Sequence, residues 1–145
     1  MVEQLSVFLA NEHGRLARMC RLLGDAHLNM HALVVADTET FGVARVICDR
    51  PHAARGVLER EGFAVSVTKV IAVALPDRPG GLAAVLEALD AAGINVEYLY
   101  CFLKPDSATA VDILRVEDVE HAVEVLTTAG VELLHAAQIY EPDAV

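Results

Sequence analysis

The sequence predicts an α+β protein built from two βαββαβ repeats, each with a four-stranded antiparallel sheet and both helices on one face. The first observation is internal repetition: sliding the chain by 66 residues superposes Gly14 on Gly80 and Asn29 on Asn95. Beyond a two-residue insertion the match continues at an offset of 68. The second observation is that both halves show the same order of apolar patterns. A repeat this long indicates a duplicated domain, because solenoid repeats have periods of about 20–50 residues.

The first half begins with a strand and a helix. Apolar residues alternate from Leu5 to Leu9, which is the period of a strand. A glycine turn follows. The next apolar residues have the spacing of a helix face, namely Leu16, Met19, Cys20 and Leu23. Two further strands are predicted at 29–35 and 43–48, joined by the polar loop 37–40.

A second helix is predicted to begin near Pro51. Proline is favoured in the first turn of a helix, because the N–H group that it lacks would have no partner within the helix there. This helix ends at Gly62, a favoured residue just beyond a helix. Its buried face is Ala54, Val57 and Leu58. The fourth strand, 63–67, runs without Gly or Pro into the next strand at 70–75. We therefore expect no flexible hinge between the repeats.

The second half repeats this order. Its predicted helices bury Leu82, Val85, Leu86 and Leu89 and then Ala122, Val125 and Leu126, and its further strands lie at 94–103, at 109–115 and from Val131. Residues 138–140 resemble the start of both first strands and suggest an additional edge strand. The predicted domains are 1–69 and 70–145, and each is close to the lower size limit for an independent core. We therefore expect their sheets to pack side by side.

Composition narrows the class of protein. The chain is 54% hydrophobic, but no apolar run approaches the roughly 18 residues of a membrane span, and no basic leader precedes an apolar segment. We expect a cytoplasmic protein with no membrane partner. The net charge of −10 at pH 7 argues against a nucleic-acid partner. Cys20, Cys48 and Cys101 lack the spacing of metal or redox sites, so we expect reduced core thiols.

The second repeat resembles the ACT domain family. The resemblance rests on the turn 76–82, on Val85, Leu86 and Leu89 of the following helix, and on Gly93-Ile94-Asn95-Val96 at the next strand. The first repeat is similar but weaker, since His27 replaces the glycine at Gly93. The resemblance covers nearly the whole chain. It implies a stand-alone pair of ferredoxin-like domains that regulates rather than catalyses and reports its ligand to a partner metabolic enzyme or to a second copy of the chain. We expect no cofactor. Residues 1–69 are neutral and residues 70–145 are acidic, and such complementary surfaces predict a homodimer or a partner complex.

The resemblance also implies a ligand site. In similar domains a small amino acid is held between two ACT units, by the first turn of one and the start of the second strand of the other. The corresponding positions here are Asn11, Glu12, His13, Gly14, Arg15, Leu16, Asn29 and Met30 in the first repeat and Asp77, Arg78, Pro79, Gly80, Gly81, Leu82, Asn95 and Val96 in the second.

The chemistry of these residues agrees with that implication. Gly80 and Gly81 at a helix start admit a ligand to backbone N–H groups, whose partial positive charge suits a carboxylate. The amides of Asn29 and Asn95 can bind both ends of a zwitterion, although asparagine also caps turns. Arg15 takes the place of Gly81 in the first repeat, so we expect the second turn to bind more tightly.

Two other functions remain open. One is a ligand-free module for protein interaction or dimerisation. The other is a small acylphosphatase-like hydrolase that would pair Arg78 with Asn95, an idea that rests on shared topology. His27 and His31 share one face of a strand, but no third metal ligand is evident, so the sequence predicts no metal site.

Overall fold

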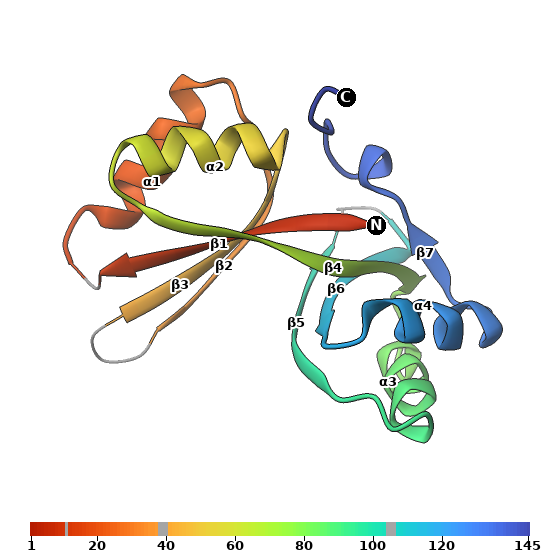
Figure 1. The fold of residues 1–145 in the computed structure, drawn as a ribbon. Helices are drawn as coiled ribbons and strands as arrows, with labels where there is room; N and C mark the ends of the chain where they lie inside the picture. The colour runs from red at the N-terminus through yellow and green to blue at the C-terminus, as the bar shows by residue number, and fades with distance from the viewer. Residues whose placement is uncertain (11, 38–40, 104–106) are drawn as a thin grey trace. The chain divides into compact units, whose positions relative to one another are not determined.

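The computed structural model describes residues 1–10, 12–37, 41–103 and 107–145. These residues form two compact units. The first unit comprises residues 3–68 and 136–145, and the second unit comprises residues 1–2 and 69–135. Both repeats have the order βαββαβ with antiparallel pairing, which confirms the predicted α+β class (Figure 1). No helix among the described residues is long and apolar enough to cross a membrane.

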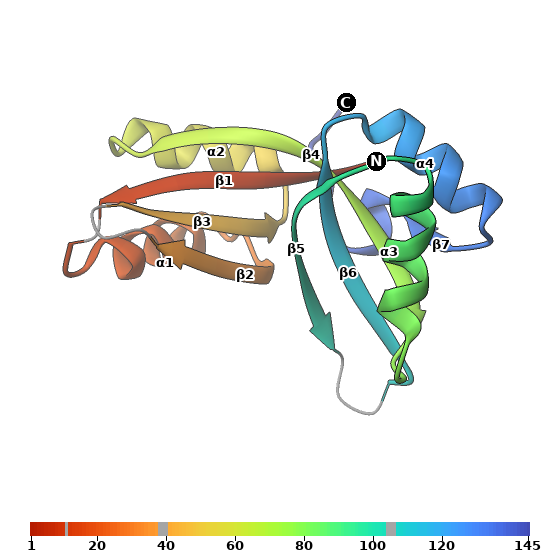
Figure 2. The ribbon, with the colours of Figure 1, turned by 90° about the horizontal axis from the view of Figure 1, so that it is seen from below.

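The first unit contains the first repeat. Its elements are β1 (Val2–Ala10), α1 (Arg15–Asp25), β2 (Met30–Asp37), β3 (Phe41–Cys48), α2 (Pro51–Arg60) and the beginning of β4 (Ala64–Pro76). Strand β3 lies between β1 and β2, so that Ala44 faces Val7 on one side and Val35 on the other. Both helices lie on the same face of this sheet (Figure 2). The core between them contains Leu5, Val7, Leu9, Met19, Leu23, Val46, Leu58 and Phe63.

The second unit has the same plan. Strand β6 (Thr109–Val116) lies between β4 and β5 (Val96–Leu103), and β7 (Glu132–Leu134) pairs with the opposite edge of β4. The helices are α3 (Gly81–Ala91) and α4 (Val119–Thr128). Their apolar faces pack on one side of the sheet, in a core that contains Ile71, Val73, Leu75, Val85, Leu89, Leu114, Val116, Ala122 and Leu126.

The predicted elements are largely confirmed, with small shifts of their ends. The two strands predicted at 63–67 and 70–75 form the single strand β4, as the absence of Gly and Pro indicated. The last strand is short, only Glu132–Leu134. The predicted loop 37–40 lies outside the described residues except for Asp37, which ends β2. Both helix faces of the first repeat are oriented as predicted, with Met19 and Leu58 fully buried.

One predicted element is wrong. Residues 138–140 do not form an edge strand; a 3₁₀ helix (Ala136–Gln138) leads into an irregular tail. The tail contacts the first repeat, although the sequence placed it with the second. The hydroxyl of Tyr140 accepts a hydrogen bond from the Glu3 amide at 3.0 Å, and Tyr140 is buried. The Glu141 amide donates to the Asp49 carboxylate at 2.9 Å. These bonds place the last ten residues in the first unit.

The expectation that all three cysteines lie in the core is also wrong. All three are free thiols, but only Cys48 is buried, whereas Cys20 is half-buried and Cys101 is exposed. Cys101 does point to the helix-covered face, because it pairs in register with Asp112. It is exposed because β5 is the outer strand of its sheet, where the helices cover the face incompletely.

Candidate functional site

The first helix of each repeat begins at a left-handed glycine. Gly14 precedes α1 with φ 86°, and Gly80 precedes α3 with φ 83°. Only glycine adopts this conformation without steric cost, so the two turns are equivalent in backbone as well as in sequence. In neither helix does a side chain of the preceding residue cap the N-terminus. This equivalence supports the assignment of both turns to one duplicated feature.

Two amide groups at each of these helix starts have no hydrogen-bond partner among the residues that the structure describes. In α3 the Gly81 amide donates to the Arg78 carbonyl at 3.1 Å, but the amides of Leu82 and Ala83 make no hydrogen bond among the described residues. The same holds in α1 for the amides of Leu16 and Ala17. Free N–H groups at a helix start carry partial positive charge. Each turn therefore leaves two N–H groups of partial positive charge without a partner in the described part of the chain.

The second helix of each repeat is different. The amides of His52 and Ala53 in α2 donate to the two carboxylate oxygens of Asp143, each at 3.0 Å. In α4, the His121 amide donates to the carboxylate of Asp118 at 3.1 Å. An aspartate of the chain therefore caps the start of each second helix, whereas no side chain that the structure describes caps the start of either first helix. This contrast distinguishes the two glycine turns from ordinary helix starts.

The turn of the second repeat is exposed from Pro76 to Gly80, which includes Asp77, Arg78 and Pro79, whereas Leu82 packs against the core. Gly81 has a structural role that the sequence did not show. A Cβ atom at Gly81 would lie 2.7 Å from the Pro76 carbonyl oxygen, too close for any larger residue without a shift of the backbone. At Gly80 a Cβ would meet nothing within 4 Å, so the space beside Gly80 is open.

The turn of the first repeat differs in its side chains. Glu12, His13 and Gly14 are exposed, and Asn11 lies outside the described residues. The guanidinium of Arg15 lies over the ring of Phe63, 4.2 Å from its centroid. This cation–π contact holds Arg15 in a defined place within the first unit. The neighbouring Leu16 is 39% exposed and adds an apolar surface to the turn.

The two candidate asparagines are exposed and lie directly before β2 and β5. The backbone of Asn29 is held by Asp49, whose carboxylate accepts from the Asn29 amide at 3.3 Å. Asn95 borders a cavity of about 230 Å³, which is also lined by Gly93, Ile94, Glu97, Glu117, Asp118 and His121. Met30 and Val96, the residues that follow, are half-buried against their cores.

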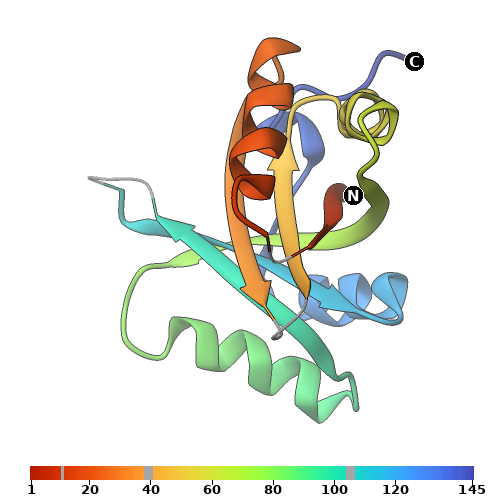
Figure 3. The same cartoon turned by 90° about the vertical axis from the view of Figure 1, so that its left-hand side faces the viewer.

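Within one repeat, the turn and the asparagine do not come together. Helix α3 runs along the sheet from the turn after β4 to the start of β5, so Gly80 and Asn95 lie at its opposite ends (Figure 3). An 11-residue helix is roughly 16 Å long at 1.5 Å per residue. One small amino acid does not span that length. The same separation removes the geometric basis for a hydrolase that pairs Arg78 with Asn95.

The two asparagine ends differ in charge. The cavity beside Asn95 is acidic, and Glu97 forms an ion pair there with Arg115 at 3.4 Å. Beside Asn29, His31 and Asp49 interact at 2.8 Å. Burial opposes ionisation of Asp49, but hydrogen bonds from the Glu141 amide, from His31 and from the Asn29 amide outweigh it and lower its pKa. An ammonium group suits the acidic end near Asn95.

Asp112 is a buried acid that the sequence analysis did not single out. It lies on the helix-covered face of β6, in register with Val73, and is only 2% exposed. Burial raises the pKa of its carboxyl group. Its counterpart in the first repeat is Ala44, so the charge is specific to the second repeat. The signal in the sequence was an acid inside the apolar strand 110–114.

The two βαββαβ repeats and their equivalent glycine turns define a tandem ferredoxin-like protein. A family model described as an ACT domain pair matches residues 1–141, and the chain therefore belongs to that family. This confirms the resemblance seen in the sequence.

Solved structures agree. Protein BT0572 from Bacteroides thetaiotaomicron is 36% identical, with a TM-score of 0.90 over 95% of this chain and 94% of that one. The ligand-free regulatory subunit of aspartate kinase from Thermus thermophilus is 16% identical, with a TM-score of 0.64 over 88% and 91% of the two chains. The corresponding subunit from Thermus flavus is 15% identical, with a TM-score of 0.62 over 88% and 92%. Comparison with curated proteins gave no match.

Proposed function

We propose that this ACT domain pair is a non-catalytic regulatory module that binds an amino acid or a related small carboxylate at an interface between two ACT units. The observation that carries the proposal is the contrast between capped and open helices. Asp143 and Asp118 accept amides at the starts of α2 and α4, whereas the amides of Leu82 and Ala83 in α3 make no hydrogen bond with any residue that the structure describes. A ligand carboxylate would accept hydrogen bonds from the amides at the start of each first helix, as the aspartates do at the second helices.

The ligand's other end is assigned to a different unit. Because α3 separates Gly80 from Asn95, the turn of one ACT unit needs the asparagine of another to surround one small molecule. That other unit is the other repeat of the same chain or a repeat of a second chain. Each asparagine has acidic neighbours that suit an ammonium group, namely Asp49 beside Asn29 and the carboxylates of the cavity beside Asn95, and the helix amides suit a carboxylate. Together these groups favour a zwitterion.

The proposed role is to report the ligand to a partner, either a metabolic enzyme or a second copy of the chain, in the cytoplasm. The Thermus structures with the same fold are regulatory subunits of aspartate kinase, which gives a precedent for an ACT pair that acts on an enzyme. A binding site between units couples occupancy to association, because a ligand that binds only the assembled state stabilises that state.

The test uses a carboxylate built into the proposed anion site. Ala83 is the exposed third residue of α3, and an aspartate there would take the place of the ligand carboxylate while favouring the helix. A thermal-shift screen of the twenty amino acids and common small carboxylates identifies a ligand, whose saturation at 100 times its Kd stabilises by roughly 2.7 kcal/mol. We expect Ala83→Asp to remove that shift and the uncharged control Ala83→Asn to retain it.

Variants of the asparagines determine which unit completes the site. We expect Asn29→Ala to weaken binding at the Gly80 turn by about 1–3 kcal/mol, the usual cost of a lost buried hydrogen bond, and Asn95→Ala to affect the turn of the first repeat instead. Calorimetry on both variants separates the two sites. If Asn95→Ala alone impairs the Gly80 site, the proposal of a site shared between units is wrong.

A specific observation supports a second candidate, a module for protein interaction. Phe8 and Phe41 are 50% and 60% exposed and lie diagonally on the helix-free face of the first sheet, where Phe41 pairs with Ala10 and Phe8 with Val43. Exposed apolar residues grouped in this way mark contact surfaces. A chain that binds no small molecule but dimerises through Phe41, as shown by loss of the dimer in Phe41→Ser, would favour this candidate.

A further inference from the structure

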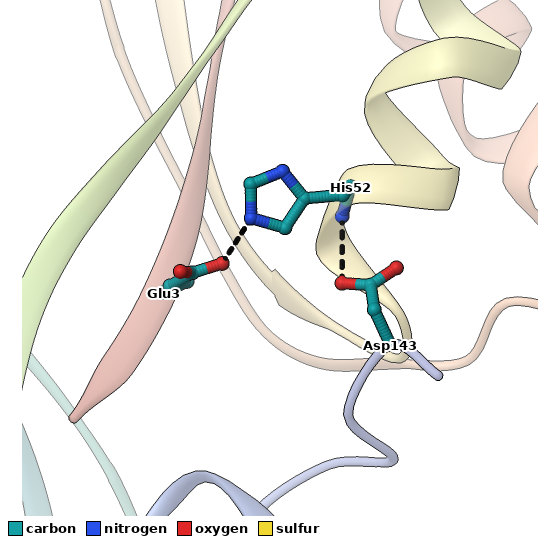
Figure 4. Close-up of side chains that lie close together, drawn as sticks. All are labelled: Glu3, His52 and Asp143. Atoms are coloured by element: carbon teal, nitrogen blue, oxygen red, sulfur yellow. Dashed lines mark hydrogen bonds and ion pairs between the residues drawn. The ribbon is translucent and has the colours of Figure 1, made fainter. Parts of the chain in front are cut away.

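Three chemically suitable side chains meet where the C-terminal tail contacts the first repeat. Glu3 comes from the start of β1, His52 from the first turn of α2 and Asp143 from the tail (Figure 4). One ligand atom from each residue lies within 4.8 Å of the others. The contributing segments are separated by about fifty residues and by ninety-one residues in the sequence. The sequence alone therefore gave no indication of this cluster.

The cluster offers one imidazole nitrogen and two carboxylates. His52 Nε2 and Glu3 Oε2 lie 2.6 Å apart. A metal ion placed between them would bind both atoms, which offer a ring nitrogen and a carboxylate oxygen as ligands. The oxygens of Asp143 accept the amides of His52 and Ala53, and each carboxylate oxygen retains a further lone pair. The capping role of Asp143 and a role as a ligand are therefore compatible.

The surroundings favour a cation. Asp49 adds a further carboxylate to this part of the first unit, where it accepts a hydrogen bond from the Glu141 amide of the tail. Together with Glu3 and Asp143 it gives this region three acidic side chains, and neighbouring negative charges attract a cation. His52 is exposed and Glu3 is half-buried, so an ion can reach the site from solvent.

We propose that Glu3, His52 and Asp143 form a binding site for a divalent transition-metal ion, with Zn²⁺ as the expected ion, which fastens the C-terminal tail to the first repeat. One nitrogen and two oxygen ligands leave a fourth tetrahedral position for water. Imidazole favours Zn²⁺ over Mg²⁺ or Ca²⁺, which prefer all-oxygen sites. The site is independent of the two glycine turns, since none of its residues belongs to them.

The experiment titrates the full chain, first freed of metal by chelation, with Zn²⁺ in a calorimeter. We expect saturable binding of one ion per chain. The variant His52→Ala keeps the backbone amide that Asp143 caps, so the helix start is preserved. Mutation of a residue that only hydrogen-bonds to a metal ligand typically lowers metal affinity by about 10–100-fold. We therefore expect His52→Ala, which removes a ligand itself, to lower the affinity for Zn²⁺ at least tenfold.

The matched control is His31→Ala, since His31 also pairs with a carboxylate in the first unit but lies outside the cluster. Binding that is lost in His52→Ala and in Asp143→Asn, and retained in His31→Ala, supports the site. Hydrogen exchange at the amides of His52, Ala53 and Glu141 should also slow when Zn²⁺ is added. Absence of saturable binding, retention in His52→Ala, or equal loss in His31→Ala would overturn the proposal. Each outcome is independent of whether an amino acid binds.

Discussion

Replacement of Asp143 by alanine tests whether the tail serves as the cap of α2. Both carboxylate oxygens of Asp143 accept helix amides at 3.0 Å, and the residue that precedes the helix, Arg50, has a left-handed φ of 43° and offers no side-chain cap. Loss of an N-cap acceptor costs about 0.5–2 kcal/mol, and loss of a negative charge at a helix start adds about 0.3–1 kcal/mol. We therefore expect Asp143→Ala to destabilise the first unit by about 2 kcal/mol.

The assay is hydrogen exchange read residue by residue, combined with urea unfolding followed by helical circular dichroism, in buffer that contains a chelator. Asp118→Ala is the matched control, because Asp118 caps α4 through a single amide at 3.1 Å. We expect the control to cost about 1 kcal/mol, half the cost of Asp143→Ala. Unchanged protection of the His52 and Ala53 amides in Asp143→Ala, or a cost no greater than that of Asp118→Ala, would refute the reasoning.

Three further predictions concern single positions. His27 occupies the left-handed conformation, with φ 57°, that Gly93 supplies in the second repeat, so His27→Gly should raise the free energy of unfolding by about 1 kcal/mol in a urea titration. Asp112→Ala introduces the residue type found at the equivalent position of the first repeat, Ala44, and should stabilise the second unit by about 1 kcal/mol at pH 7 because it removes a buried charge. Since burial raises the pKa of Asp112, this gain in stability should shrink as the pH falls and the wild-type carboxyl group becomes protonated. Asp49→Asn should show the opposite pH dependence, because the lowered pKa of Asp49 stabilises the wild type at pH values above the ordinary aspartate pKa. The difference in free energy of unfolding between wild type and variant should disappear as the pH falls through the folded-state pKa. A difference that does not depend on pH would contradict this prediction.

Much of the fold follows from local sequence patterns. The duplicated glycines at 14 and 80 fix equivalent left-handed turns, and periodicity identifies the buried faces of the helices, because both signals act over a few residues. The continuous strand β4 follows from the absence of Gly and Pro between the repeats. These features depend on backbone conformation and burial, which each short segment largely determines by itself.

The tail and the cluster at Glu3 depend instead on distant contacts. Tyrosine is common in β-strands, but the burial of Tyr140 and its hydrogen bond with Glu3 outweigh that preference. The role of Asp143 as a cap requires the approach of segments ninety-one residues apart, for which no local pattern exists. Cys101 illustrates a further limit: alternation gives the face of a strand correctly but does not show that an outer strand is poorly covered.

The prediction of the candidate site was also uneven. The sequence indicated the two turns, but it did not distinguish Gly80, beside which space is open, from Gly81, where a Cβ would meet the Pro76 carbonyl at 2.7 Å. Nor did it show that the second helices are capped and the first are not. Asp118 caps α4 locally, but the cap of α2 is Asp143, so the distinction is complete only when the tertiary fold is known.

The central claim is that the open amides of the first helices hold a ligand's carboxylate. The most direct measurement is a ¹⁵N nuclear magnetic resonance titration of the full chain with the ligand identified by thermal shift. We predict that the amides of Leu82 and Ala83 show the largest downfield shifts, and that the shifts vanish in Ala83→Asp but persist in Ala83→Asn. The proposal would be contradicted if the ligand bound while the resonances of the Leu82 and Ala83 amides, and those of the equivalent Leu16 and Ala17 amides, did not shift.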